Sequence, residues 1–519
     1  MHIIQMFDRS VRNHPSKLAF TGDGGDFTYR DAQVLTNKTA RACLREGFGR
    51  DARVSLISPN NGKSQLVVLG AMRANMVWCN INLRDTPENI VDILKRDEVN
   101  LLFYHSMAGH MIPLLRQHVN SLKEVVCIDQ PDKNGVFLDE WIEPESDSIP
   151  DIPIKTDDIG LQASTGGTTG RPKIAVANHS WTSWSMMGFA SCLHFNKPPV
   201  YLSVAPITHA GGVITLFTLT QGGTNVMMAQ LDLDSILNAI QEQRISLMFL
   251  PPTLTYMILK HPMAKKIDYS SLEYFISTSA PIAPEKIAEV MDLFGPVFGQ
   301  MYGQSESGVP NTYMSPQDYM EALQDESKRH RLASCGKQTQ IVEAMEILDE
   351  DDHPLGPGVR GEIAVKGPTV MLHYLKDPEA TAEIQSGGWH HTGDIGYRDE
   401  DGFFYIVDRK RDMIVSGGFN IYPFEIEQVL LEHPKVVDCC VIGVPDEKWG
   451  EAVKAVVVKV PQAEITDDDL MQYIRGKLGG MKTPKYIDFW EQLPLSPAGK
   501  VLKRVVREKY WEDKERRVG

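Results

Sequence analysis

No stretch of this sequence approaches the run of about 18 apolar residues that a membrane-spanning helix requires. Residues 1–9 lack a basic segment followed by a long apolar one, so we expect no signal peptide. The last residues match no recognised targeting tag. These absences predict a soluble cytoplasmic protein without a membrane span.

Cysteine is also scarce. The chain has seven cysteines, an odd number, and no Cys-x-x-Cys pair. This pattern argues against a disulfide framework or a zinc ribbon and suits a reducing compartment. Cys439 and Cys440 are adjacent in an apolar run, so we expect them to face the core and the neighbouring strand surface.

Positive charge is in deficit, because 53 Lys and Arg residues stand against 68 Asp and Glu residues and the net charge is −15. Such a chain offers little to nucleic acid or to an anionic membrane, and we expect neither as the main partner. A local basic funnel for an anionic ligand is still compatible with this total. With 519 residues, 42% of them hydrophobic, the chain can build two or more domains, and a homo-oligomer is left open.

Short apolar strands alternate with helix-length amphipathic segments over most of the chain. Such strands, joined by helical crossovers, predict a mostly parallel, doubly wound sheet with ligands at the carboxyl ends of the strands. The expected strands are 54–57, 101–104, 125–128, 159–163, 200–203, 247–250 and 274–277, and the expected helices are 64–75, 87–97, 233–243 and 253–260.

From about residue 335 the pattern changes to alternating segments such as 343–348 and 361–365, which indicates a small antiparallel β region. The charge cluster 408–412 is either a solvated turn or a hinge. Beyond it, strands (436–444, 452–460) and helices (425–432, 467–478) indicate a separate α+β domain. We therefore predict an α/β protein with a large N-terminal domain over 1–410, built of doubly wound sheets plus a small β region, and a small mobile C-terminal domain over 411–519.

Residues 164–173 read Ser-Thr-Gly-Gly-Thr-Thr-Gly-Arg-Pro-Lys, which suits the binding of a triphosphate. Glycines let the backbone approach phosphate oxygens, successive N–H groups form an anion nest, and hydroxyls and basic side chains add donors. The run is not a Walker A loop, because Arg171 and Pro172 separate Gly170 from Lys173, and it is not the Rossmann Gly-x-Gly-x-x-Gly. Taken alone, it is equally typical of a flexible surface turn.

Further segments with polar groups follow the loop in sequence. They are 205–212 with His209 at a glycine-rich bend, 277–281, 301–306, 389–394 ending in Asp394, and 494–500 with Lys500 on a Pro/Gly-rich loop. In this order they resemble the adenylate-forming enzymes: acyl- and aryl-CoA synthetases, peptide-synthetase adenylation domains and beetle luciferase. Each motif alone is weak, but the ordered set extends through nearly the whole chain.

The resemblance implies an ATP site. The loop threonines and Lys173 would address the phosphates, Tyr302 would pack on adenine, and Asp394 and Arg409 would meet the ribose or phosphate. Glu306 would hold Mg²⁺, which prefers oxygen ligands. The implied ATP- and AMP-binding residues are Thr165, Gly166, Gly167, Thr168, Thr169, Gly170, Lys173, Ser279, Ala280, Pro281, Tyr302, Gly303, Gln304, Ser305, Asp394, Arg409 and Lys500. Gly166, Ile174 and Ser305 depart from the residues usual in the family.

The resemblance also implies catalytic and hinge roles. Lys500 would neutralise the attacking carboxylate and the charge on the α-phosphate, and His209 would form a gate beside the acyl pocket. Arg411 falls at the hinge position, and a loop with Ser416, Gly417 and Gly418 would line the coenzyme A tunnel. Outside this context, a lone lysine is usually a solvated charge and a lone histidine is usually structural.

The implied reaction joins a carboxylic acid to the α-phosphate of ATP and then transfers the acyl group to coenzyme A. No carrier-protein domain follows residue 519, which favours coenzyme A over a carrier protein as the acceptor. Loading of a separate carrier protein, luciferase-like oxygenation and nucleotide binding without catalysis are the alternatives.

The acid is less clearly specified. In the family, the helix with Trp181, Trp184, Met186, Met187 and Phe189 helps to wall the acyl pocket, but the pattern is equally typical of helix core. No basic residue there offers a partner for a second carboxylate. We expect a monocarboxylic acid of medium length or with a ring, rather than acetate or an amino acid.

Overall fold

The structure is a computed structural model that describes residues 2–165, 172–278, 282–446, 448–495 and 501–511. The chain divides into two compact units. Unit 1 comprises Met1–Thr165, Lys173–Ala344 and Val365–Glu383, and unit 2 comprises Gly166–Pro172, Met345–Ala364 and Ile384–Gly519. The domain boundary between residues 410 and 411 stays a prediction.

The first sheet of unit 1 has the strand order β19-β9-β8-β4-β3-β5-β6-β7. Strands β3 to β6 pair in parallel, β8 joins them in parallel through β4, and β9 runs antiparallel to β8. The strands are β3 (Arg53–Ile57), β4 (Val77–Asn80), β5 (Leu101–Tyr104), β6 (Glu124–Cys127), β7 (Val136–Phe137), β8 (Ile159–Ser164), β9 (Ile174–Asn178) and β19 (His373–Tyr374).

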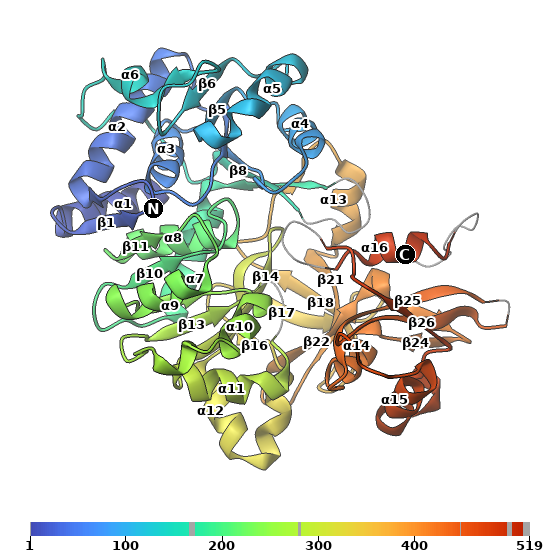
Figure 1. The fold of residues 1–519 in the computed structure, drawn as a ribbon. Helices are drawn as coiled ribbons and strands as arrows, with labels where there is room; N and C mark the ends of the chain where they lie inside the picture. Colours follow the sequence, from blue (N-terminus) through green and yellow to red (C-terminus); the bar gives the residue numbers. More distant parts are fainter. Residues whose placement is uncertain (1, 166–171, 279–281, 447, 496–500, 512–519) are drawn as a thin grey trace. The chain divides into compact units, whose positions relative to one another are not determined.

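Both faces of this first sheet are covered by helices. Leu101 and Phe103 of β5 point into a core shared with α2 and α3, whereas Leu102 and Tyr104 point into a second core shared with α4 and α5. Figure 1 shows β5 and β6 between these two pairs of helices. This alternation of side chains between two helix-covered faces confirms the predicted doubly wound sheet. The helices are α2 (Tyr29–Arg45), α3 (Gly62–Arg73), α4 (Pro87–Arg96), α5 (Ile112–His118) and α6 (Leu138–Ile142).

In the second sheet of unit 1 the strands follow the order β16-β15-β14-β13-β12-β10-β11-β1-β2. Strands β11, β10, β12, β13 and β14 pair in parallel, and β15 runs antiparallel to β14. The strands are β1 (Leu18–Gly22), β2 (Phe27–Thr28), β10 (Val200–Ser203), β11 (Thr224–Met227), β12 (Leu247–Phe249), β13 (Tyr274–Ser277), β14 (Phe298–Gln304), β15 (Gly308–Met314) and β16 (Gly336–Gln338).

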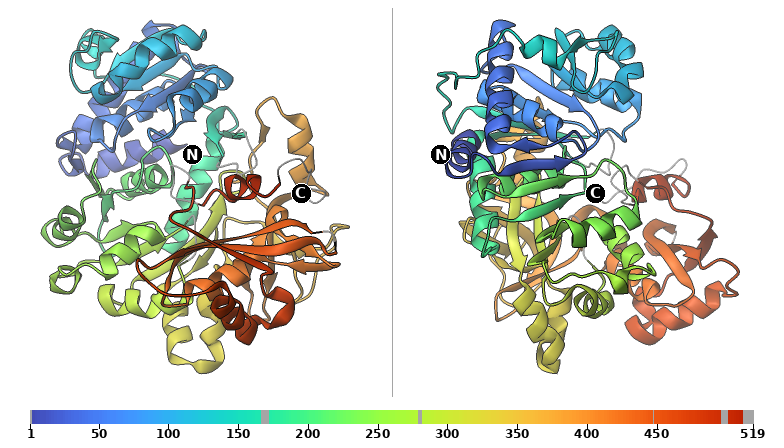
Figure 2. Two further views of the ribbon diagram at one scale, coloured as in Figure 1. Left: turned by 45° about the vertical axis from the view of Figure 1, so that its right-hand side comes forward. Right: turned by 60° about the vertical axis from the view of Figure 1, so that its left-hand side comes forward.

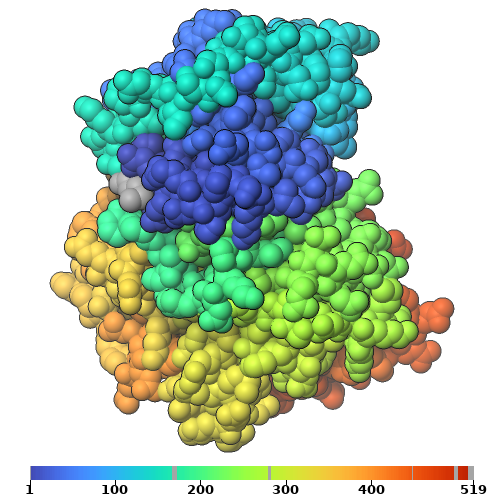
Figure 3. All heavy atoms as spheres, turned by 90° about the vertical axis from the view of Figure 1, so that its left-hand side faces the viewer, coloured from blue at the N-terminus to red at the C-terminus, as the bar shows by residue number. Residues whose placement is uncertain are grey.

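Helices of the second sheet contribute to the same core as the N-terminal helix. Phe189 of α7 and Phe217 of α8 have ring centroids 5.5 Å apart, and both lie in one core with Phe7 of α1. Figure 3 shows the blue N-terminal residues against green residues of this region. The helices are α1 (Ile3–Asn13), α7 (His179–Cys192), α8 (Ala210–Thr220), α9 (Leu233–Glu242), α10 (Pro252–Leu259), α11 (Pro284–Phe294) and α12 (Pro316–Gln324).

Unit 2 contains one group of strands in the order β17-β18-β21-β22 and a separate sheet in the order β24-β23-β26-β25, with β27 beside β26. Pairing is antiparallel for β21–β22, β25–β26 and β23–β24. The elements are β17 (Ala344–Leu348), β18 (Gly361–Lys366), β21 (Trp389–Arg398), β22 (Phe403–Arg409), β23 (Ile414–Ser416), β24 (Phe419–Ile421), β25 (Val436–Asp446), β26 (Gly450–Lys459), β27 (Tyr486–Trp490), α14 (Pro423–Leu431), α15 (Asp467–Lys482) and α16 (Lys503–Glu508).

Strand β25 separates two small cores. Cys439 packs in the core that includes α14 and α15, and Cys440 packs in the core that includes Val506 of α16. Figure 1 shows α15 and α16 on opposite sides of β25 and β26, and both views in Figure 2 keep them apart. The core position expected for one cysteine is therefore found for both, and neither is left on a strand surface outside a core.

The strands and helices expected from the sequence are present, with ends that differ by a few residues. Among the described residues, no helix combines the length and the apolar character needed to cross a membrane.

Candidate active site

The two ends of the Gly/Thr loop meet at the carboxyl end of β8. The Thr165 N–H donates to the Lys173 carbonyl oxygen at 2.8 Å, and Ser164 of β8 pairs with Ile174 of β9. This pairing sets Thr165 and Lys173 side by side at the sheet end. Gly166, Gly167, Thr168, Thr169 and Gly170 lie outside the described residues.

Asn80, the last residue of β4, ties the base of this loop to the histidine turn. Its Oδ1 accepts the Ser164 N–H at 2.8 Å, and its Nδ2 donates to the Thr208 carbonyl oxygen at 3.1 Å. The Thr208 Oγ1 lies 3.0 Å from Nδ1 of His209, which precedes α8. Burial lowers the pKa of His209, which favours its neutral ring at pH 7. The side-chain amide of Asn80 therefore connects the base of the Gly/Thr loop to the turn that contains His209.

Asn60 makes a second link of the same kind. Its Oδ1 accepts the Ile207 N–H at 3.0 Å, and its Nδ2 donates to the carbonyl oxygens of Ser203 and Ala205. Both asparagines are absent from the sequence predictions. Their position at or just after a parallel strand's carboxyl end is the signal that identifies them, because ligands bind at that edge.

Tyr302, Gly303 and Gln304 close strand β14, and Ser305 and Glu306 lie in the turn that leads to β15. The Tyr302 side chain is mostly buried. A β-carbon at position 303 would lie 2.2 Å from the Gly308 carbonyl oxygen, so only glycine fits there. Ser279, Ala280 and Pro281 lie outside the described residues.

Tyr374 brings Glu306 and Lys173 together in unit 1. The Tyr374 hydroxyl donates to Oε1 of Glu306 at 2.9 Å. The Lys173 ammonium lies 4.9 Å from the centroid of the same ring, within the range of a cation–π contact. The carboxylate implied for Mg²⁺ and the cation implied for phosphate therefore share one side chain that the sequence analysis did not select.

In unit 2, Asp394 and Arg409 face each other across β21 and β22. Arg409 Nε lies 2.8 Å from Asp394 Oδ1, and the two residues are backbone partners. The Asp394 side chain is only 3% exposed, whereas that of Arg409 is 42% exposed. The structure thus pairs the two residues implied for the ribose, and their role stays a prediction.

The cluster 408–412 is not a solvated turn, because Asp408 and Asp412 are buried. Burial raises the pKa of Asp408 to about 6. Burial lowers the pKa of Arg411, although the Asp412 charge opposes this shift. The Asp412 carboxylate accepts from Arg507 at 3.1 Å. Of the two interpretations of this cluster, the hinge remains a prediction.

Ser416 ends strand β23, and Gly417 and Gly418 follow it. Gly417 has φ +59 and donates its N–H to the Trp449 carbonyl oxygen at 2.8 Å. A β-carbon at Gly417 would lie 2.6 Å from the Trp449 ring, so this turn requires glycine. Their binding of coenzyme A stays a prediction. Lys500 lies outside the described residues.

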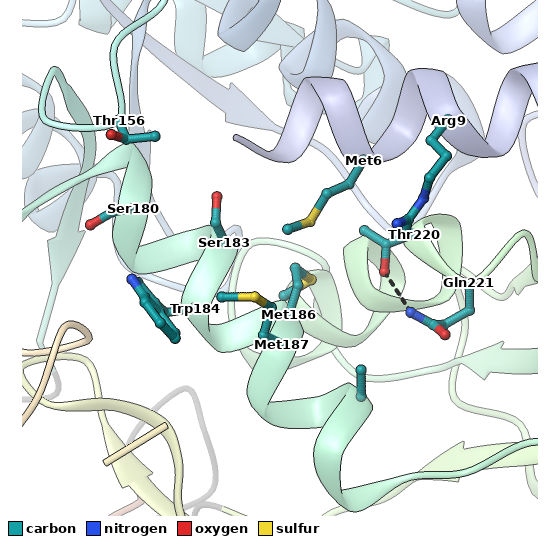
Figure 4. A pocket seen from close by; sticks show the side chains of 11 residues that line it. Met6, Arg9, Thr156, Ser180, Ser183, Trp184, Met186, Met187, Thr220 and Gln221 are labelled. Carbon is teal, nitrogen blue, oxygen red and sulfur yellow. Dashed lines mark hydrogen bonds between the residues drawn. The ribbon is translucent and has the colours of Figure 1, made fainter. Parts of the chain in front are cut away.

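The helix α7 divides between core and surface. Met186 and Phe189 belong to the core, while Trp184 and Met187 are partly exposed. Figure 4 shows Trp184 and Met187 beside a hollow of about 360 Å³. The hollow is lined by Met6, Arg9, Thr156, Ser180, Ser183, Trp184, Met186, Met187, Ala190, Thr220 and Gln221.

The hollow lies at the C-terminal end of α8, whereas His209 lies at the N-terminal end of the same helix. Thr220 ends α8, whereas His209 precedes its first residue. A helix of this length spans about 16 Å at a rise of about 1.5 Å per residue. The hollow therefore does not adjoin the predicted gate, and the acyl wall predicted for α7 stays a prediction.

Family models and known proteins match the chain over most of its length. The model described as AMP-binding enzyme matches residues 7–375, and the model described as AMP-binding enzyme C-terminal domain matches residues 425–500. The feruloyl-CoA synthase of Amycolatopsis sp is 32% identical over 97% of this chain and 98% of that protein.

A second relative is the medium/long-chain-fatty-acid–CoA ligase FadD8 of Mycobacterium tuberculosis, which is 39% identical over 370 residues. That match spans 70% of this chain and 63% of that protein. Among solved structures, the amide bond synthetase McbA from Marinactinospora thermotolerans is similar with a TM-score of 0.87 and 27% identity. The similarity covers 98% of this chain and 100% of that one.

Proposed function

Because the chain belongs to the AMP-binding enzyme family, among its adenylate-forming acyl- and aryl-CoA synthetases, we propose that it converts a carboxylic acid, ATP and coenzyme A into an acyl-CoA, AMP and pyrophosphate. The observation that supports the proposal is that Tyr374 contacts both Lys173 and Glu306, through its ring and its hydroxyl respectively. A cation for phosphate and a carboxylate for a divalent ion lie together beside the loop that suits a triphosphate.

In the first half-reaction, a carboxylate oxygen attacks the α-phosphorus and the bond to the pyrophosphate oxygen breaks. A carboxylate is a poor electrophile because its leaving group would be oxide, and adenylation supplies AMP as a better one. Lys173 binds the departing phosphates and Lys500 neutralises the reacting charges, so both lower the barrier by electrostatics and proximity.

Glu306 is a suitable ligand for Mg²⁺, because a carboxylate fits a hard cation that also binds phosphate oxygens. One of its carboxylate oxygens accepts a hydrogen bond from the Tyr374 hydroxyl. When bound, Mg²⁺ would neutralise negative charge on the phosphates.

In the second half-reaction, the thiolate of coenzyme A attacks the acyl carbonyl and AMP leaves. Asp394 and Arg409 hold the ribose through both steps. Rotation about Arg411 withdraws Lys500 and presents Gly417 and Gly418 to the thiol, so one site serves two reactions in turn.

The acid is a monocarboxylic acid of medium length or with a ring. The names of the relatives support this range, since they specify feruloyl-CoA synthase and a medium/long-chain-fatty-acid–CoA ligase. The similarity to an amide bond synthetase favours an amine as a second candidate acceptor.

A panel of carboxylic acids with ATP and Mg²⁺ tests the proposal. The panel should contain acetate, medium-chain fatty acids, hydroxycinnamic acids and amino acids, each assayed with coenzyme A, with a simple amine and with neither. We expect pyrophosphate, AMP and a thioester with a medium-chain or ring-bearing acid. Mass spectrometry identifies the product.

Three results would contradict this account. Acetate as the best substrate would contradict the proposed acid, and an amide as the main product would contradict coenzyme A as the acceptor. Absence of pyrophosphate release with every acid would contradict acid activation itself.

A further inference from the structure

The segment 369–375 is bound to both sides of the candidate phosphate site. On one side, the Leu375 N–H donates to the Ile174 carbonyl oxygen and Tyr374 pairs with Ala175, directly after Lys173. On the other side, the Met371 N–H donates to the Glu306 carbonyl oxygen at 2.7 Å. The backbone of this segment therefore connects strand β9 to the turn after β14.

The Tyr374 side chain repeats this connection with functional groups. Its hydroxyl donates to the Glu306 carboxylate, and its ring face lies under the Lys173 ammonium. The ring itself is buried, with 7% of its surface exposed. A buried ring in a backbone-anchored segment has little freedom to turn, so both contacts have a defined geometry.

We propose that Tyr374 is a positioning residue that sets the orientation of Glu306 for Mg²⁺ and of Lys173 for the ATP phosphates. The inference rests on the proposed function, because it presupposes that MgATP binds between these two groups. A hydrogen bond from a neutral hydroxyl holds one carboxylate oxygen without cancelling the charge. A ring face likewise holds an ammonium without neutralising it, so both groups keep their charge for the ligand.

Two substitutions separate the contacts. Tyr374→Phe removes the hydroxyl that donates to Glu306 but keeps the ring that contacts Lys173. Tyr374→Leu removes both contacts. Isothermal titration calorimetry with ATP, at a series of Mg²⁺ concentrations and without an acid, measures binding in the absence of turnover.

For Tyr374→Phe we expect the Mg²⁺ concentration that half-saturates ATP binding to rise about tenfold, the typical effect of losing a hydrogen bond to a charged group. Affinity at saturating Mg²⁺ should change little. For Tyr374→Leu we expect the same rise in Mg²⁺ requirement, plus a further loss of about threefold in ATP affinity at saturating Mg²⁺, from the lost cation–π contact.

Tyr29→Phe is the matched control. Tyr29 is fully buried in unit 1, and its hydroxyl donates to the carbonyl oxygens of Leu219 and Gly223. This substitution removes a buried hydroxyl elsewhere, so a purely structural effect would appear in it too. We expect its Mg²⁺ requirement to match that of the wild type.

An unchanged Mg²⁺ requirement in Tyr374→Phe would overturn the inference while the proposed function stands. The same rise in Tyr29→Phe would also overturn it, because the effect would then be structural. If the wild-type chain binds no MgATP at all, the proposed function fails and the inference fails with it.

Discussion

Lys173 in unit 1 and Lys503 in unit 2 carry the same charge in opposite surroundings. The Lys173 ammonium lies over the neutral ring of Tyr374. The Lys503 ammonium lies 2.8 Å from Glu427, and its side chain is 17% exposed. The partner, rather than the residue type, therefore decides whether a lysine forms an ion pair within the fold or faces a neutral ring.

The pKa of Lys503 reflects this difference. Burial alone would lower it, but the negative charges of Glu427, Asp408 and Asp412 raise it above the ordinary value. Lys503 therefore stays charged and connects α16 to α14 and to the cluster 408–412. These residues lie beside the predicted hinge, and the ion pair of Lys503 with Glu427 joins α16 to α14 there.

The largest expected effect is the loss of this buried charge. Lys503→Met leaves three carboxyl groups without their shared cation, which should lower the free energy of opening of the β25 and β26 amides by about 4 kcal/mol. Hydrogen exchange measures this quantity locally. Lys173→Met should leave the same amides within about 0.5 kcal/mol of the wild type. Equal losses in both variants would erase the distinction between the two lysines.

Lys500 lies three residues before Lys503, but for Lys500 we expect a loss of activity without a loss of stability. Lys500→Ala should lower the rate of pyrophosphate release about 100- to 1000-fold, the effect of removing a group that stabilises transition-state charge. It should spare thioester formation from a supplied acyl adenylate and leave the β25 and β26 amides unchanged. Equal loss in the two half-reactions would contradict the role proposed for Lys500.

A buried histidine makes unit 2 sensitive to acid. Both ring nitrogens of His390 lack a hydrogen-bond partner in the described part of the chain, and burial lowers its pKa to about 4. The unfolded chain, with an ordinary pKa of about 6.5, therefore binds this proton more readily than the folded one. Stability is full above about pH 6.5 and falls by about 3 kcal/mol as the pH drops to about 4.

His390→Phe should remove this component, because phenylalanine fills the site without a titrating group. The measurement is the opening free energy of the β21 and β22 amides as a function of pH, compared between the variant and the wild type. Identical pH dependence in the two proteins would show that His390 does not control it.

The smallest expected effect concerns Asn80 in unit 1. Asn80→Ala leaves the Ser164 N–H and the Thr208 carbonyl oxygen without this partner, so the loop base loses its tie to the His209 turn. We expect the KM for ATP to rise about fivefold, equivalent to about 1 kcal/mol. Asn80→Asp keeps the acceptor for Ser164 but sets a carboxylate oxygen against the Thr208 carbonyl oxygen and adds a negative charge at the base of the phosphate loop, so it should give a larger rise. A KM unchanged in both variants would remove Asn80 from the site.

The sequence predicted the strands that carry the site better than the contacts between them. The segments 101–104 and 200–203 alternate their side chains between two helix-covered faces, and this requirement appears directly as apolar runs. The loop at 164–173 was also selected, because its residue types suit phosphate, and Asp394 and Arg409 were selected through the resemblance to the adenylate-forming enzymes.

Tyr374 and Lys503 could not be selected in this way, and the strand-end position of Asn80 indicates the edge where ligands bind but not the partners of its side chain. Tyr374 is separated from Glu306 by 68 residues, and Asn80 is separated from Thr208 by 128. Their importance comes from partners that only the tertiary fold brings near. A tyrosine or a lysine in isolation carries no pattern that distinguishes it from a surface residue.

In the proposed reaction, a carboxylate oxygen of the acid attacks the α-phosphorus of ATP. The most direct test uses an acid substrate labelled with ¹⁸O in both carboxylate oxygens, with mass spectrometry of the nucleotide product after thioester formation. We predict AMP that carries one ¹⁸O atom in its phosphate. Unlabelled AMP, or ADP together with ¹⁸O-labelled inorganic phosphate, would contradict the claim.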